Sequence, residues 1–289
     1  INYRFFSLVL SKISRPEKLP DLVSLSNFAD WSGLDLLIKK DELLFNGITV
    51  ASDSSQHFLA LFSDQKPQKK EITRIIPGNV RYFLSYGWSN PSMFCRRFQN
   101  RTPHGEEITP EQAMVTKLID QFQLNIAEYF LPWIGNEGCL FVLENDKTTE
   151  EVAYNAFAAP DSSRTVSYLK SLADTLGIRT DSLMYRGKKI YRMDLPAFIP
   201  ALFGELFARA QTRCFTILDG YIVFSGQPRD LEQVINAVSE NNTLSKDRSY
   251  KDFENSLAEK SNVYCYFSTR NALNSLKGMM SQDLLDQLA

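Results

Sequence analysis

The feature that constrains the fold most is the run 213–226, RCFTILDGYIVFSG, which predicts a tight β-hairpin. Asp219–Gly220 suits a type I′ turn, because that turn needs positive φ at both central positions. Both the odd and the even positions of its two arms are apolar, namely Phe215, Ile217, Leu218, Tyr221, Ile222, Val223 and Phe224. A strand with one solvated face alternates apolar and polar residues, so we expect both faces of this hairpin to be covered.

A second dipeptide of this kind, Asn46–Gly47 in DELLFNGITVAS, predicts another hairpin turn. Each predicted hairpin is followed by a connector, a strand and a helix, which suggests an internal duplication. After Gly47 the elements are strands over 57–63 and 79–88 and a helix that begins at Asn90–Pro91. After Gly220 they are helices over 229–240 and 249–259, a strand over 262–269 and a helix that begins at Thr269.

The region between these two units predicts further helices and strands. Thr109 is a suitable N-cap for a helix over 109–130, with Pro110 in its first turn. Two strands follow, CLFVLE and VAYNAFAA; then comes a helix over 164–177, capped by Asp161–Ser163, and a hairpin around Gly187. This order predicts an α+β fold with mixed, mainly antiparallel sheets, hairpins and packed helices. Regular βαβ units are lacking, which argues against a doubly wound nucleotide fold.

The expected organisation is an N-terminal leader or docking segment over 1–30, a first α+β unit over 31–148 and a second over 149–289. One continuous domain is the alternative. Tyr3, Phe6, Leu10 and Ile13 fall at helical spacing, so the leader could dock on the body or contact a membrane. The run 269–289 carries leucines three or four residues apart. We expect a removed N-terminal signal or anchor and a C-terminal truncation.

Composition excludes several classes of protein. The chain has 289 residues, of which 44% are hydrophobic, and its formal net charge is −2. This usage is that of an ordinary globular protein with a large core. Because there is no basic excess, we expect no nucleic-acid partner.

The chemistry-bearing residues are few. The four cysteines, Cys95, Cys139, Cys214 and Cys265, lack metal-site spacing, and the last three are expected to be buried free thiols, although the sequence does not exclude a disulfide. His57 and His104 are far apart and form no metal-binding motif. Nucleophile-elbow, dinucleotide-binding and phosphate-binding loop motifs are all missing. We therefore name no catalytic, cofactor-binding or metal-binding residue, and we expect no cofactor.

A candidate interaction surface lies in the run 81–98, RYFLSYGWSNPSMFCRRF. It combines aromatic rings with guanidinium groups, the residue types enriched at binding hot spots. Its members are Tyr86, Trp88, Phe94, Arg96, Arg97 and Arg101. The alternative is that the rings belong to the core and the arginines to a solvated helix face.

Several stretches together resemble one known family. They are FADWSGLDLLIKKDELLFNGIT, AEYFLPWIGNEGCLFVLE with its Trp133, Gly135 and Glu137, YNAFAAPDSSRTVSYLKSLADTLG, and CFTILDGYIVFSGQPRDLEQVINAV. The family is catalogued as domain of unknown function 3352, and the resemblance covers most of 28–268. It implies a bacterial envelope protein outside the cytoplasm, held by an N-terminal membrane segment or signal. It carries over no catalytic residue.

Three functions are consistent with the sequence. The first is a non-catalytic interaction or scaffold domain of the cell envelope, whose partner is another envelope protein or its own missing C-terminal region. In this reading it meets the membrane only through a removed N-terminal segment. The second is a glycan or small-molecule binding module lined by Trp31, Trp88 or Trp133. The third is a hydrolase that uses carboxylates distant in sequence, for which a cleft with carboxylates of divergent pKa would be the evidence.

Overall fold

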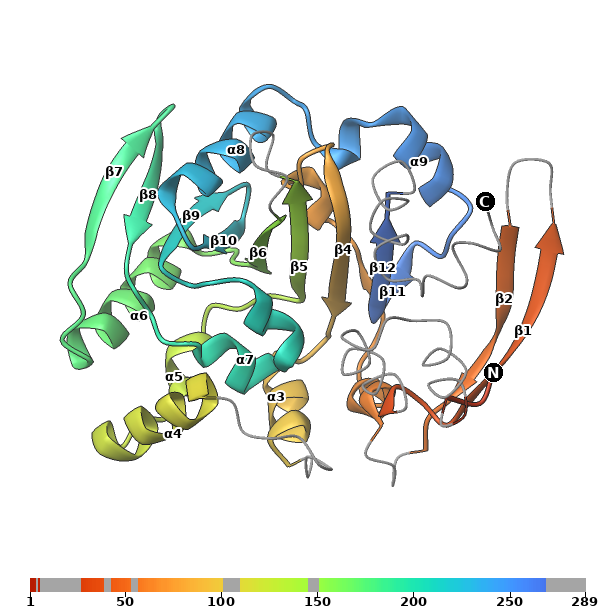
Figure 1. The fold of residues 1–289 in the computed structure, drawn as a ribbon, viewed down its shortest axis with the longest axis horizontal. Helices are drawn as coiled ribbons and strands as arrows, with labels where there is room; N and C mark the ends of the chain where they lie inside the picture. The colour runs from red at the N-terminus through yellow and green to blue at the C-terminus, as the bar shows by residue number, and fades with distance from the viewer. Residues whose placement is uncertain are drawn as a thin grey trace, which may run out of the picture. The chain divides into compact units, whose positions relative to one another are not determined.

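The computed structural model describes residues 1–3, 5, 27–38, 43–52, 57–100, 110–144 and 151–268. The chain divides into two compact units, one formed by Ile1–Asp64 with Thr269–Ala289 and the other by Gln65–Ser268 (Figure 1). This division differs from the expected ranges 1–30, 31–148 and 149–289. The expected boundary at 148 falls between two strands, Glu137–Glu144 (β5) and Glu151–Ala158 (β6), which pair with each other in one sheet.

The larger unit is built on one eight-stranded sheet in which every neighbouring pair is antiparallel. Its spatial order is β12-β4-β5-β6-β10-β9-β8-β7. The six other strands of this sheet are β4 (Val80–Gly87), β7 (Asp181–Tyr185), β8 (Lys188–Arg192), β9 (Cys214–Leu218), β10 (Tyr221–Ser225) and β12 (Val263–Phe267). A short accessory pair joins β3 (Gln68–Lys69) to β11 (Lys260–Ser261). The predicted α+β class, with mainly antiparallel strands, is confirmed.

Helices cover both faces of this sheet (Figure 1). The α-helices of the unit are α3 (Pro91–Gln99), α4 (Pro110–Phe122), α5 (Ile126–Phe130), α6 (Ser162–Thr175), α7 (Phe198–Phe203), α8 (Pro228–Ser239) and α9 (Arg248–Glu254). Three short 3₁₀ helices are η4 (Ile72–Arg74), η5 (Glu205–Arg209) and η6 (Leu244–Lys246). Side chains from η4, α8, η6 and α9 pack on one face, and rings from α3, α7 and η5 pack on the other.

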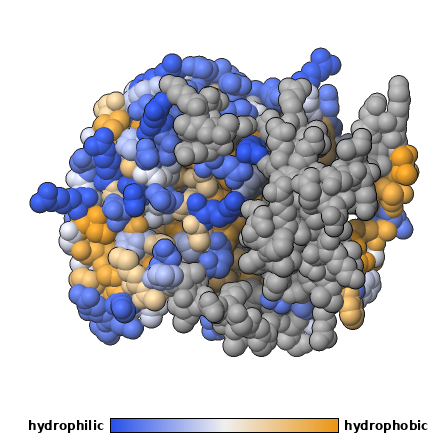
Figure 2. Space-filling model, viewed as in Figure 1, coloured by the Kyte–Doolittle hydropathy of each residue, from blue (hydrophilic) through white to orange (hydrophobic). Residues whose placement is uncertain are grey.

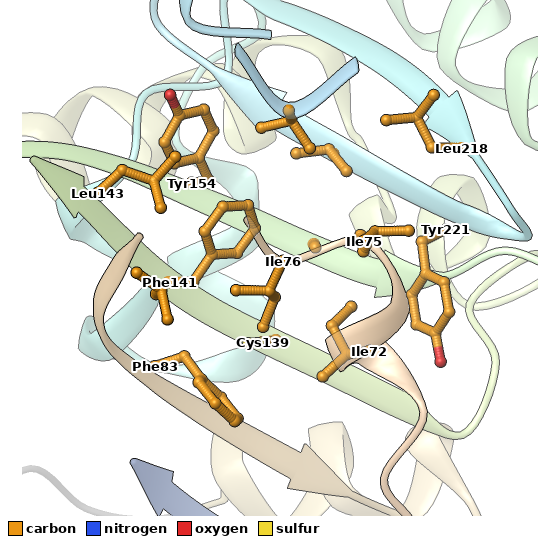
Figure 3. Packing of buried hydrophobic residues seen from close by; sticks show 14 of the residues in the cluster. Ile72, Ile75, Ile76, Phe83, Cys139, Phe141, Leu143, Tyr154, Leu218 and Tyr221 are labelled. Carbon is orange, nitrogen blue, oxygen red and sulfur yellow. The ribbon is translucent and has the colours of Figure 1, made fainter. Parts of the chain in front are cut away.

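The strands are apolar on both faces because both are buried. On β5, Cys139, Phe141 and Leu143 belong to the cluster beneath η4 and α8. Figure 3 shows Phe141 and Cys139 among Ile72, Ile75 and Ile76. The alternate residues Leu140 and Val142 point to the opposite face and are also fully buried.

The type I′ turn predicted at Asp219–Gly220 and the hairpin predicted around Gly187 are both confirmed. Asp219 and Gly220 have φ values of 46° and 81° and join β9 to β10, both faces of which are buried as expected. Arg186 and Gly187 have φ values of 45° and 74° and join β7 to β8. Positive φ at both positions is the signature of a type I′ turn.

Two predicted elements differ from the structure. The helix expected over 109–130 is interrupted at Gln123, whose φ of 51° ends α4 before α5 begins. The strand expected over 57–63 is instead the 3₁₀ helix Phe58–Phe62 (η3) of the smaller unit. Within that unit the Phe58 ring stacks on Phe28 and meets Phe62 edge to face, so the apolar run is buried by ring packing without strand pairing.

The smaller unit also contains a two-stranded sheet of Trp31–Ile38 (β1) and Leu43–Val50 (β2). The prediction of a turn at Asn46–Gly47 is wrong, because these residues lie inside β2 opposite Asp35 and Leu34. Residues 39–42, which come between the two strands in sequence, lie outside the described residues. A Cβ on Gly47 would stand 1.9 Å from the Gly33 carbonyl oxygen, so the glycine is needed for the close approach of two strands.

The two hairpins that suggested a duplication lie in different sheets, β1–β2 alone and β9–β10 inside the eight-stranded sheet. The segments that follow them do meet. Strand β4 pairs with β12, β3 pairs with β11, and Pro77 forms a bridge with Thr243. Whether this arrangement arose by duplication stays a prediction.

Candidate functional site

The strongest concentration of perturbed ionisable groups surrounds Glu137, the first residue of β5. Its two glycine neighbours in sequence, Gly135 and Gly138, are required by close packing. A Cβ on Gly138 would lie 2.6 Å from the Trp88 ring, and one on Gly135 would lie 2.9 Å from the Ala158 side chain. The Trp88 indole N–H donates to the Gly135 carbonyl at 2.7 Å, which fixes the chain just before Glu137.

The Glu137 carboxylate accepts four hydrogen bonds and is only 2% exposed. Oε2 receives the backbone N–H groups of Glu71 and Ile72, each at 3.1 Å, and the Tyr221 hydroxyl at 2.8 Å. Oε1 receives the Ser85 hydroxyl at 2.9 Å. Figure 3 shows the Tyr221 ring beside Ile72 at this end of the sheet. A buried carboxylate is tolerated when donors surround it in this way.

Burial raises the pKa of Glu137 above its usual value. The Tyr221 hydrogen bond is the largest opposing influence, followed by the Glu71 amide, the Ser85 hydroxyl and the Ile72 amide. Burial is also the main reason that the pKa of Tyr221 is raised, and the nearby Glu137 charge adds to the effect.

A second set of groups lies next to the first. Lys70 forms an ion pair with Glu254 of α9, and its ammonium lies 3.5 Å from the centroid of the Tyr264 ring. The Tyr250 hydroxyl is 3.3 Å from Glu254 Oε1 and 3.4 Å from the Tyr264 hydroxyl. Burial lowers the pKa of Lys70, although Glu254 and Glu137 oppose this, and burial raises the pKa of Tyr264 to about 12.

The two sets form one polar cluster because Tyr264 of β12 lies opposite Ser85 of β4 in the sheet, and Lys70 directly precedes Glu71. We define the polar cluster as Lys70, Ser85, Glu137, Tyr221, Tyr250, Glu254 and Tyr264. Its bonds connect η4, α9 and four strands, β4, β5, β10 and β12. Chemically, the arrangement anchors the covering elements to the sheet through charge-assisted hydrogen bonds.

The sequence-predicted interaction surface is not brought together as a surface. Tyr86, Trp88 and Phe94 are 4%, 0% and 0% exposed, and they pack with Phe203 and Phe207 beneath α7 and η5. Of the two interpretations of this run, burial supports the alternative for the rings: the sheet is covered on this face as well, so they belong to the core. Arg96 is exposed and Arg97 half-buried on α3, whereas Arg101 lies outside the described residues.

The other candidate residues divide between core and surface. Trp88 and Trp133 are buried, and Trp31 is 48% exposed in the smaller unit. Cys95, Cys139 and Cys214 are buried free thiols, while Cys265 is free but exposed, which corrects the prediction for that residue. His57 Nε2 lies 3.0 Å from Asp30 Oδ1, and His104 is outside the described residues. Within the described ranges, no group of three or more His, Cys, Asp or Glu is placed to hold a metal ion.

A surface feature that the sequence reading missed is the apolar β1–β2 hairpin, whose large side chains are exposed on both faces. They are Trp31, Leu34, Leu36, Leu37, Ile38, Phe45 and Ile48. Figure 2 shows apolar surface over this hairpin on the side that faces the viewer. The run WSGLDLLI has apolar residues at both odd and even positions, and this pattern could have identified the exposed apolar hairpin from the sequence. In the part of the chain that the structure describes, no helix is long and apolar enough to cross a membrane.

The fold and the polar cluster define an α+β protein whose antiparallel sheet is covered on both faces and tied to its covering elements by buried ionisable groups. A family model described as Protein of unknown function (DUF3352) matches residues 97–289, and the chain belongs to this family. A search of curated proteins returns no match. A search of solved structures likewise returns none.

Proposed function

We propose that this chain is a non-catalytic interaction or scaffold domain of the bacterial cell envelope. The resemblance to this family supports a location outside the cytoplasm and an anchor at its N-terminal side. In this proposal the larger unit is a rigid body that presents surfaces to another envelope protein or to a further part of its own polypeptide.

The observation that supports this proposal is the state of Glu137. A general acid or nucleophile must reach a substrate atom. The Glu137 carboxylate is 2% exposed, and donors of its own chain occupy both of its oxygens. Lys70 is similarly engaged, between Glu254 and the Tyr264 ring. These two buried charged groups therefore contribute to the stability of the fold.

The glycan-binding alternative now rests on Trp31, because the other two indoles are buried. A single exposed indole could stack against only one sugar ring, which is less than the tryptophan-lined groove that this alternative expected. If the hydrolase alternative used Glu137, this carboxylate would first have to be released from its four donors. We therefore prefer the interaction role.

The test uses the full-length, anchored protein in envelope membranes, with a photo-crosslinking residue at exposed positions of each unit. The proposal expects one partner to be enriched over a heat-unfolded control, and its binding to be reproduced with purified components. Two results would overturn the proposal. One is recovery of the bait alone from every position, and the other is turnover of a cell-wall glycan or an unstructured protein by the purified chain.

A further inference from the structure

Strand β7 is one end of the eight-stranded sheet, since β8 is its only neighbour in the described residues. Its five residues pair with β8 without a break from Asp181–Arg192 to Tyr185–Lys188. The outer side of a terminal strand presents unpaired backbone groups that can accept another strand. The β7 edge is therefore a place where an extended chain could add to this protein.

Apart from its short length, β7 lacks the usual devices that protect an edge, which are proline, a bulge and inward-pointing lysines. Its one charged residue, Asp181, is the first of the strand and lies 3.5 Å from Arg192 of β8. The three following apolar or aromatic residues are Leu183, Met184 and Tyr185, and Met184 is 65% exposed. The centre of the edge is thus apolar and accessible.

The turn fixes which backbone groups point outward. A two-residue turn closes on a hydrogen-bonded pair, here Tyr185 and Lys188, and hydrogen-bonded positions alternate along an antiparallel strand. The amides of Leu183 and Tyr185 therefore face β8. The amides of Ser182 and Met184 face away from the sheet and are the donors that an added strand would use.

Basic residues surround this edge. The stretch 179–192 has one acidic residue, Asp181, and five basic ones, Arg179, Arg186, Lys188, Lys189 and Arg192, in a chain whose net charge is −2. Arg179 precedes the strand and Arg186 follows it, but Arg186 forms an ion pair with Glu240 at 2.6 Å, so the positive charge at this edge comes mainly from Arg179, Lys188 and Lys189. Lys189 is exposed, and its ammonium lies 5.1 Å from the Tyr191 ring centroid.

We propose that β7 binds an extended, acidic segment of a partner protein, which adds to the sheet as a ninth strand. Backbone hydrogen bonds to Ser182 and Met184 would supply the pairing. Apolar residues at the centre of the segment would contact Leu183 and Met184, and acidic residues near its ends would meet the basic side chains. This inference rests on the proposed interaction role and names one surface and one kind of partner for it.

The test uses the ¹⁵N-labelled chain and the peptide acetyl-EEVTVEE-amide, with acetyl-KKVTVKK-amide as the charge-reversed control. Binding of the acidic peptide should slow amide exchange at Ser182 and Met184 and leave Leu183 and Tyr185 unchanged, because the latter are already paired. The lysine peptide should not bind. Equal binding of both peptides, no binding, or protection elsewhere would overturn the proposal.

Variants separate the backbone and charge contributions. Met184→Pro removes an outward amide and should abolish binding without breaking the β7–β8 ladder, which the Leu183 and Tyr185 amide signals will report. Lys188→Gln with Lys189→Gln should weaken binding roughly fivefold at low salt. Lys251→Gln on the exposed face of α9 is the matched control and should change nothing.

Two further outcomes would overturn the proposal and assign a different occupant to the β7 edge. Concentration-dependent dimers that Met184→Pro abolishes would make a second copy the occupant. Binding to phosphatidylglycerol vesicles that the lysine pair controls, with no effect of Met184→Pro, would make the region a lipid-binding patch. Failure of the peptide test alone leaves the crosslinking test of the interaction role unaffected, so the two failures are distinguishable.

Discussion

The Tyr221 hydroxyl donates a 2.8 Å hydrogen bond to Glu137 Oε2, although the residues are 84 positions apart in sequence. Glu137 begins β5 and Tyr221 begins β10, and β6 lies between these strands in the sheet. The bond therefore crosses β6 and joins two strands that are not neighbours, on the face of the sheet that η4 covers. It is one of four that satisfy a buried carboxylate, and the account of this protein depends on that carboxylate being structural.

Removal of this donor should destabilise the fold. Tyr221→Phe leaves a buried carboxylate with one partner fewer, and we expect a loss of about 1.5–3 kcal/mol in the free energy of unfolding. The control is Tyr185→Phe, which removes a half-buried hydroxyl that bonds to the uncharged Asn236 side chain at 3.1 Å and also interacts with Arg186, and it should cost about 0.5–1.5 kcal/mol. Chemical denaturation measures both. An equal or smaller loss for Tyr221→Phe would contradict the assignment.

Stability should fall as pH rises through the raised pKa of Glu137. The folded state binds the Glu137 proton more tightly than the unfolded state does, so protonation of Glu137 stabilises the fold. This stabilisation is fully present below the unfolded pKa, near 4.5, and is lost as the pH rises above the folded pKa. Denaturation curves at a series of pH values should therefore show a steeper fall for the wild type than for Glu137→Gln. Parallel profiles would show that Glu137 does not titrate in this way.

Packing against Gly138 should depend largely on the indole of Trp88, the nearest group to an added Cβ, with the Phe157 ring next at 2.9 Å. Gly138→Ala places a methyl group 2.6 Å from the ring and should cost about 1–3 kcal/mol. In the double variant with Trp88→Phe, the smaller ring makes room, so the combined loss should be less than the sum of the single losses. Thermal unfolding of the four proteins gives this coupling, and strict additivity would show that the ring is not the obstacle.

The cysteines should differ in reactivity. Cys265 is exposed and should be the one thiol of the native chain that reacts with Ellman's reagent, while the three buried thiols react only on unfolding. Desolvation raises the pKa of the Cys265 thiol to about 11, so its reaction should be slow at pH 7.5 and faster at higher pH. Cys265→Ser should abolish the native reaction. Stoichiometric labelling that survives this substitution would contradict the packing described.

Local signals explain what could be predicted from sequence. The turn at Asp219–Gly220 requires positive φ, and only a few residue types tolerate it, so the dipeptide located the hairpin correctly. The same kind of dipeptide misled at Asn46–Gly47, because Gly47 serves the close approach of Gly33 across two strands. Glycine permits both a positive φ in a turn and a close approach of two strands, and the local sequence does not show which of the two applies.

The candidate site depends on long-range contacts and could not be predicted in the same way. Glu137 stood out only through the family resemblance, and its donors come from Glu71, Ile72, Ser85 and Tyr221. For Tyr86, Trp88 and Phe94, residue type is the same in a hot spot and in a core. The deciding fact was that α7 and η5 cover this face, which is a property of the tertiary fold.

The most direct test of the account is the titration of the Glu137 side chain by carbon NMR in the purified protein. If its own chain encloses the carboxylate, its midpoint will lie above that of an ordinary glutamate and will not move between low and high salt. A midpoint in the ordinary range that shifts with ionic strength would mean that the group faces solvent and is open to a ligand, which would contradict the structural role assigned to it.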